Sequence, residues 1–167
     1  MADSDRAEKH ADERHAAEHG LVEVDEVGFP VVLVRLPVAL NKAAIHSMFE
    51  GLDRVLRRDA RFSLVVDTRA LKQFPTAVER NEIGQWMKAR TLAEARYNVG
   101  NAIVLRSPAV RATLTAIHWI RRPVTDHVYL PDVVEAIDWS VGQLTKANVP
   151  IPPAVAALRE AERARAR

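Results

Sequence analysis

One short apolar run near the middle of the chain constrains the fold more than any other stretch. Residues 62–67 read Phe-Ser-Leu-Val-Val-Asp, with charged residues close by on both sides. The residues before and after the run place apolar side chains at helical spacing. A mostly apolar strand between two helices is typical of the centre of a sheet that helices cover on both faces. This run therefore predicts an α/β fold built around a buried strand.

The order of the other predicted elements favours a mostly parallel sheet. Alternating apolar and acidic residues at 21–27, a Gly-Phe-Pro turn and an apolar return at 31–36 predict an antiparallel hairpin. Three strand–helix alternations follow, which favour parallel strands joined through helices. We therefore expect a single-domain α/β fold with a mixed, mostly parallel five-stranded sheet and about four helices. The remaining elements are helices at 41–59, 76 to about 90 or 95, 108–120 and 132–144, strands at 62–67, 102–105 and 127–130, and a turn at 98–100.

Three of the predicted helices begin at residues that satisfy or remove free backbone amides. Asn41 can cap the first helix, and Thr76 with Glu79 has the spacing of a capping box. Ser107 followed by Pro108 marks a third start, because proline gives up an amide that would lack a partner there. We expect these positions to fix the helix starts.

Length and composition indicate one α/β domain between two charged segments. A chain of 167 residues with 48% apolar residues suits a single core. Residues 1–20 are acidic and lack an apolar stripe, so we expect a flexible tail. The domain itself is expected at 21–148. Residues 149–167 are expected to form a proline-rich exit and an Arg/Ala/Glu tail, which would be a short exposed helix at best.

Several classes of function are disfavoured by what the sequence lacks. There is no cysteine, so disulfides and thiolate metal sites are excluded. No apolar run approaches the ~18 residues of a membrane span, and a cytoplasmic location is the simplest expectation. The net charge of +2 is too small to favour a nucleic acid partner. Without a phosphate loop, a nucleophile elbow or a metalloprotease motif, and with His118 and His127 isolated, we expect no catalytic centre, cofactor or metal.

Polar residues that follow two neighbouring strands suggest an anion site. Thr68 and Arg69 come after the central strand, and Arg106 and Ser107 come after the next one. Ligands of open parallel sheets bind beyond such strand ends, where helices begin with free amides. Arg111 falls in the first turn of the following helix, and arginine supplies paired donors for phosphate or carboxylate. The alternative is that Ser107 only caps its helix and the arginines are solvated.

A second set of candidate residues lies away from the main apolar stripes of two helices. Ala112, Ala116 and Trp119 fall roughly opposite the stripe of the helix at 108–120, at 100° per residue. Trp139 is likewise out of phase with the stripe of its own helix. A tryptophan outside the stripe usually finds other apolar cover. Either these four residues form an interface with a partner or a second copy of the chain, or the proline-rich exit or a flanking helix covers them.

A resemblance to a known family rests on four parts of the chain: residues 62–67, Glu79-Arg80, Arg106-Ser107-Pro108 with Arg111, and residues 135–139. Their order and type resemble the SpoIIAA-like branch of the STAS domains, small α/β modules related to anti-sigma-factor antagonists. The likeness covers about residues 21–145 and implies a binding or regulatory module without a catalytic centre. In the better-known antagonists a serine after the central strand is phosphorylated. Here the position reads Asp-Thr-Arg-Ala-Leu, without the motif's second hydroxyl and glycine, so the resemblance carries over Thr68 alone.

Two functions follow as predictions. The first is a non-enzymatic, regulatory STAS-like module that binds a protein partner or forms a homodimer. The alternative is a carrier of a small molecule or lipid, with a pocket and an anion site at the carboxyl ends of the strands, since related folds carry lipids.

Overall fold

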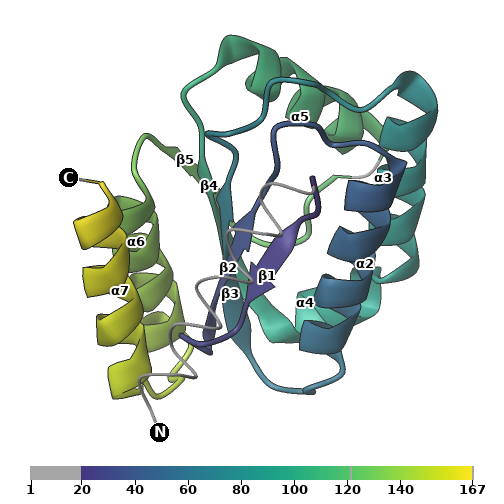
Figure 1. Ribbon diagram of the computed structural model, residues 1–167. Helices are drawn as coiled ribbons and strands as arrows, with labels where there is room; N and C mark the ends of the chain where they lie inside the picture. Colours follow the sequence, from purple (N-terminus) through teal and green to yellow (C-terminus); the bar gives the residue numbers. More distant parts are fainter. Residues whose placement is uncertain (1–19, 121, 167) are drawn as a thin grey trace, which may run out of the picture.

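A five-stranded sheet forms the middle of the molecule, with helices on both faces (Figure 1). The computed structural model describes residues 20–120 and 122–166, so the predicted tail lies outside the described residues apart from Gly20. The strand order is β1-β2-β3-β4-β5, with β1 antiparallel to β2 and the other neighbours parallel. The predicted α/β class, the hairpin and the mostly parallel sheet are confirmed. The strands are β1 (Glu23–Asp25), β2 (Val31–Arg35), β3 (Phe62–Asp67), β4 (Asn98–Val104) and β5 (His127–Leu130).

The described residues contain six helices, two more than the sequence analysis counted. One extra helix arises because the predicted helix after β3 is divided near Arg90. There the Thr91 hydroxyl donates to the Lys88 carbonyl at 2.9 Å, and such side-chain bonds compete with continuous helix. None of the helices in this part of the chain is long and apolar enough to cross a bilayer. The helices are α2 (Lys42–Leu56), α3 (Ala77–Ala89), α4 (Thr91–Tyr97), α5 (Pro108–Ile120), α6 (Val133–Lys146) and α7 (Pro153–Arg165).

The helices form two layers that give the sheet two apolar cores. Helices α2, α3, α4 and α5 cover one face, and α6 and α7 cover the other (Figure 1). Successive residues of a strand point to opposite faces, so β2 and β3 contribute to both cores. In β2, Val32 and Val34 face the first layer, whereas Val31 and Leu33 face the second.

The predicted helix starts are confirmed. The Asn41 side chain accepts a hydrogen bond from the Ala44 amide at 3.0 Å. Thr76 and Glu79 form the reciprocal capping box, with bonds of 3.3 and 2.7 Å. Helix α5 begins at Pro108. These local signals are read correctly because each depends on only a few adjacent residues.

The start of β4 differs from the prediction. The sequence analysis placed a turn at 98–100 and a strand from residue 102, but the strand already begins at Asn98. Its pairing with β3 is irregular, because Phe62 pairs with Asn98 and Leu64 with Asn101. This β-bulge accommodates the glycine at position 100, which the sequence analysis interpreted as part of a turn.

The C-terminal segment also differs from the expected exposed tail. Helix α7 packs beside α6 and buries Val155, Leu158 and Glu162. Leu158 lies so close to Gly28 that a Cβ there would come within 2.6 Å of its Cδ2 atom. The sequence analysis did not recognise the buried face of this helix, because it counted apolar residues only and one of the three buried residues is a glutamate.

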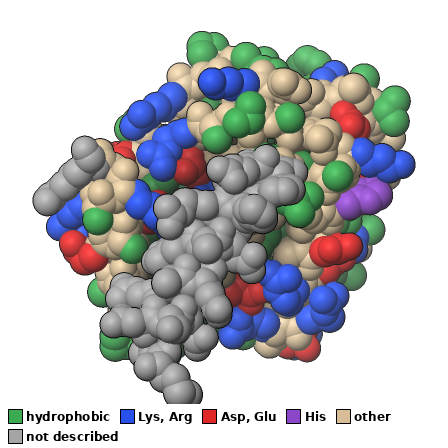
Figure 2. All heavy atoms as spheres, in the orientation of Figure 1, with side chains coloured by type: hydrophobic (Ala, Val, Ile, Leu, Met, Phe, Trp, Pro, Cys, Tyr) green, Lys and Arg blue, Asp and Glu red, His purple; other side chains and the backbone are tan. Residues whose placement is uncertain are grey.

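Acidic and basic side chains are mixed on the outside of the molecule. On the face in Figure 2, Lys and Arg side chains lie close to Asp and Glu side chains. Glu26, for example, accepts hydrogen bonds from Arg54 at 2.7 Å and from Arg58 at 2.6 Å. Burial acts to raise the pKa of Glu26, but the hydrogen bonds and charges of the two arginines outweigh it and hold the pKa below its ordinary value.

Candidate functional site

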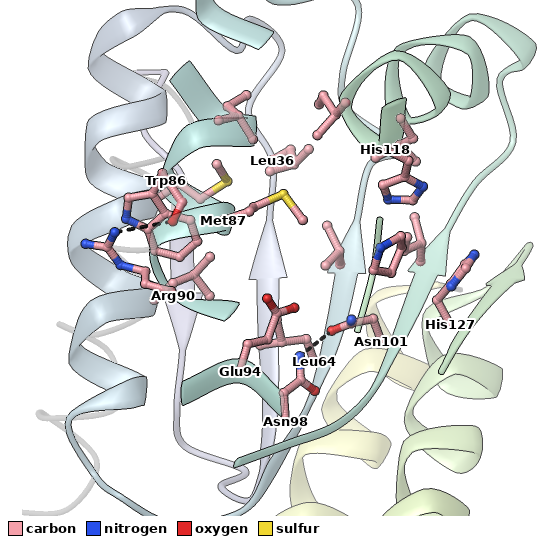
Figure 3. A pocket seen from close by; sticks show the side chains of 18 of the residues that line it. Leu36, Leu64, Trp86, Met87, Arg90, Glu94, Asn98, Asn101, His118 and His127 are labelled. Atoms are coloured by element: carbon pink, nitrogen blue, oxygen red, sulfur yellow. Dashed lines mark hydrogen bonds between the residues drawn. The ribbon is translucent and has the colours of Figure 1, made fainter. Parts of the chain in front are cut away.

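An apolar cavity lies between the sheet and the helical layer of α2 to α5 (Figure 3). Its volume is about 190 Å³. Leu64 and Val66 of β3 line it from the sheet, and Leu52, Trp86 and Leu114 line it from α2, α3 and α5. The cavity is therefore built from elements that lie far apart in the sequence.

The burial pattern of β3 shows where the space is left. Ser63 and Val65, which point toward α6, have an exposed fraction of 0%. Leu64 and Val66 point the other way and are only partly buried, although β3 is the central strand and helices cover both faces. Protein cores normally leave few voids larger than a water molecule. The packing is thus closed toward α6 and open toward the α2–α5 layer.

Trp86 and Arg90 line the cavity at the end of α3, and each has a partner in α2. The rings of Phe49 and Trp86 stack with an interplanar angle of 1° and a centroid separation of 4.9 Å. Arg90 lies over the Trp86 ring at 4.4 Å. Its guanidinium also donates two hydrogen bonds to the Asp53 carboxylate, of which the bond from Nη2 measures 2.6 Å. The Arg90 charge is therefore already matched by Asp53.

Two asparagines line the cavity toward the amino ends of β4 and β5 (Figure 3). Asn98 donates from Nδ2 to Oδ1 of Asn101 at 2.8 Å, and Asn101 donates from Nδ2 to the Thr125 hydroxyl at 2.9 Å. The Gly100 amide donates to Oδ1 of Asn98 at 3.0 Å. These bonds hold both carboxamides in fixed orientations. Glu94 lies near Asn98, and His127 is the β5 partner of Asn101 (Figure 3). His118 lines the cavity from α5.

The two histidines that the sequence analysis treated as isolated are neighbours in the fold. The ring centroids of His118 in α5 and His127 in β5 are 5.6 Å apart. No sequence motif links them, because the loop between α5 and β5 brings them together. No group of three or more His, Cys, Asp or Glu residues that could hold a metal ion occurs in the described part of the chain. Both histidines line the cavity.

The strand ends chosen for the predicted anion site are adjacent in the sheet. Asp67 at the end of β3 pairs with Val104 at the end of β4. Thr68 is buried, and its hydroxyl donates to the Val104 carbonyl at 2.6 Å. A kinase could reach this hydroxyl only after that hydrogen bond opens. Ser107 is partly buried, and its carbonyl accepts the Arg111 amide in the first turn of α5 at 3.2 Å.

Each arginine of the predicted anion site has a partner within the chain. Arg69 donates to both carboxylate oxygens of Asp67, at 2.9 and 2.8 Å, and these hydrogen bonds hold the pKa of Arg69 above its ordinary value. Arg106 donates to the Pro131 carbonyl at 2.9 Å. Arg111 lies over the Tyr129 ring at 4.7 Å. An anion at this edge would compete with these contacts.

The predicted interface residues lie on two different faces of the sheet. Trp119 of α5 has an exposed fraction of 85%, and Ala112 is exposed as well. Ala116 is partly buried. Trp139 of α6 packs in the other layer, where a Cβ at Gly100 would lie 2.8 Å from its Cη2 atom. Trp139 therefore has apolar cover from other described residues, whereas Trp119 is largely exposed.

A charged cluster that the sequence analysis missed joins α7 to the first two strands. Arg35 of β2 contacts Glu23 of β1 and Glu162 of α7, each at 2.6 Å. The Glu162 side chain has an exposed fraction of 3%. Burial acts to lower the pKa of Arg35, but the two carboxylates outweigh it and raise the pKa above its ordinary value. Pairing across such sequence distances leaves no local pattern.

The fold and the site define a mixed α/β domain with an apolar cavity on one face of its sheet. No family model, curated protein or solved structure matches the chain. The resemblance to the STAS domains therefore stays a prediction.

Proposed function

We propose that the chain is a binding protein without a catalytic centre, and that a small apolar molecule occupies the cavity between the sheet and the α2–α5 layer. The observation that carries this proposal is the cavity of about 190 Å³, lined mainly by Leu, Met, Ile, Val, Phe and Trp side chains. An apolar cavity of about 150 Å³ is already enough to bind benzene in another protein. The volume therefore suits one substituted aromatic ring or a short aliphatic chain.

The nature of the lining supports the proposal. The space is partly open to solvent, and water that enters it meets mainly apolar side chains. Poorly ordered water of this kind is displaced favourably by an apolar group. Larger side chains in the lining would close the space, so the open space favours a use for it.

Binding of toluene to the chain tests this proposal. A ligand that binds only the folded state at ten times its dissociation constant stabilises it by about 1.4 kcal/mol. For a chain of this size, the melting temperature should rise by roughly 3–6 °C. The control is Val66→Phe, which places a larger side chain in the cavity and should weaken the effect. A melting temperature that toluene leaves unchanged in the wild type would refute the proposal.

We propose as a second candidate the regulatory STAS-like module that binds a protein partner or a second copy of the chain. The exposed Trp119 side chain favours it, because a tryptophan rarely remains 85% exposed on a surface that meets only water. Sedimentation of the wild type beside Trp119→Glu is the test for self-association. A wild type that remains a monomer at high concentration argues against a homodimer.

The two candidate functions predict that different molecules are bound to the protein in its host cell. We propose that the protein is located in the cytoplasm. Native mass spectrometry of protein purified from its host should show a retained small molecule if the cavity is used. A retained polypeptide would favour the partner-binding module instead.

A further inference from the structure

The bulge in β4 turns two asparagines toward the same side of the sheet. Phe62 and Leu64 of β3 are two residues apart, but their partners Asn98 and Asn101 are three apart. In a regular strand, residues three apart point to opposite faces. The extra residue removes this alternation, and both side chains line the cavity (Figure 3). Bulges commonly re-aim side chains next to functional sites.

The bulge is fixed by packing from the opposite face of the sheet. Gly100 lies within it, and Trp139 of α6 packs against Gly100 so closely that a Cβ would meet its ring at 2.8 Å. Asparagine is depleted in strands, and a carboxamide adds nothing to apolar packing. A fixed pair of carboxamides at the end of an apolar cavity is therefore a polar subsite that the fold holds in place.

The two carboxamides retain both donor and acceptor capacity. Each has two N–H donors and a carbonyl oxygen with two lone pairs. Asn98 uses one donor toward Asn101 and one lone pair toward the Gly100 amide. Asn101 uses one donor toward Thr125 and one lone pair toward Asn98. Each side chain thus keeps one N–H and one lone pair, which suits a group that both donates and accepts.

The charges around the subsite favour an uncharged ligand. Among the described lining residues, the only guanidinium is that of Arg90, and Asp53 already binds it through two hydrogen bonds. A carboxylate or phosphate on the ligand would therefore lack the paired donors of an available guanidinium at this site. A hydroxyl group needs no such charged partner.

We infer that Asn98 and Asn101 bind the hydroxyl group of an uncharged small amphiphile, such as a phenol or a short alcohol, whose apolar part fills the cavity. This inference rests on the proposed function. It places the polar end of the ligand at the amino ends of β4 and β5, away from the anion site expected at the carboxyl ends.

Three probes of similar size test the inference on the full-length chain: toluene, p-cresol and benzoate. The measurement is the dissociation constant of each probe at pH 7, from amide and carboxamide shifts in two-dimensional nitrogen–proton NMR spectra. The variant is Asn101→Leu, which keeps the size but removes both hydrogen-bonding groups. The matched control is Asn81→Leu, the same change at an exposed position of α3.

The hydroxyl should contribute to affinity only where the subsite is intact. We expect the ratio of the toluene to the p-cresol dissociation constant to fall by about 3- to 10-fold in Asn101→Leu and to stay unchanged in Asn81→Leu. In the wild type, p-cresol should shift the carboxamide signals of Asn98 and Asn101 more than toluene does. Benzoate should bind at least about tenfold more weakly than p-cresol.

The outcomes separate this inference from the proposed function. The hydroxyl subsite is overturned if toluene binds but the ratio of the toluene to the p-cresol dissociation constant is unchanged in Asn101→Leu. It is also overturned if benzoate binds as tightly as p-cresol. Either result leaves the proposed binding of an apolar molecule in the cavity intact. A wild type that does not bind toluene overturns both. If Asn101→Leu does not fold, the wild-type carboxamide shifts decide, and equal shifts with toluene and p-cresol overturn the inference.

Discussion

Adding one methylene group to each of two adjacent valines of β3 tests whether the space beside the sheet is real. Val65 and Val66 are neighbours in the central strand, and their side chains point to opposite faces. Val65 has an exposed fraction of 0% in the core against α6, whereas Val66 lines the cavity. The substitutions Val65→Leu and Val66→Leu make the same chemical change in the same strand. Any cost of losing the β-branched side chain is therefore similar in both variants.

The two substitutions should change the free energy of unfolding in opposite directions. Extra methylenes in a closed core force shifts that cost about 1–3 kcal/mol, and we expect this loss for Val65→Leu. A methylene that enters an empty apolar space gains up to about 0.8 kcal/mol, and we expect a gain of this order or no loss for Val66→Leu. The variants should thus differ by roughly 1–4 kcal/mol. At about 2–4 °C per kcal/mol, the difference in melting temperature should be several degrees or more.

Urea unfolding followed by circular dichroism measures this difference. The slope of the free energy against urea should be the same in the wild type and both variants, because the surface exposed on unfolding hardly changes. The urea concentration at the unfolding midpoint should fall in Val65→Leu and should stay unchanged or rise in Val66→Leu. If both variants lose the same stability, the face of β3 toward α2–α5 is as tightly packed as the other, and the reasoning fails.

Three further predictions concern charged residues. In a double-mutant cycle of Arg35→Met and Glu162→Gln, urea unfolding should give a coupling of about 1–3 kcal/mol, and a coupling near zero would show that the 2.6 Å contact does not help to hold α7 on the sheet. The two arginines lower the pKa of Glu26 in the folded state. The ionised Glu26 side chain therefore stabilises the fold above the ordinary carboxyl pKa of about 4.3. This contribution is lost as the pH falls through the lower folded-state pKa. The stability difference between wild type and Glu26→Gln should therefore shrink on acidification, whereas a constant difference from pH 7 to pH 3 would contradict this linkage. The double variant Arg106→Ala with Arg111→Ala should lose any phosphate-dependent rise in melting temperature, and an unchanged rise would remove the anion site at the strand ends.

The sequence predicts this fold well where the signals are local. The apolar run of β3, the Asn41 cap and the capping box at Thr76 each depend on residues within one element, and the structure confirms them. The start of β4 was missed because its glycine resembles a turn until the pairing with β3 shows a bulge. The cavity could not be predicted, since it depends on how four helices pack over β3 rather than on any residue alone. An asparagine pair next to a predicted strand was the one available signal.

The strand order explains why the cavity, rather than the strand ends, is the stronger candidate site. Open α/β sheets bind ligands at their carboxyl edge where the strand order reverses and helices depart to opposite faces, which opens a crevice. Here β2, β3, β4 and β5 follow one another in a single direction, and the helices that connect them all lie on one face. The order of the described strands never reverses, so the topology itself opens no such crevice at the carboxyl edge. The arginines at that edge also bind partners within the chain. Space for a ligand then depends on how closely the one-sided layer of helices sits on the sheet. The partly buried Leu64 and Val66 show that this layer leaves room directly over the central strand.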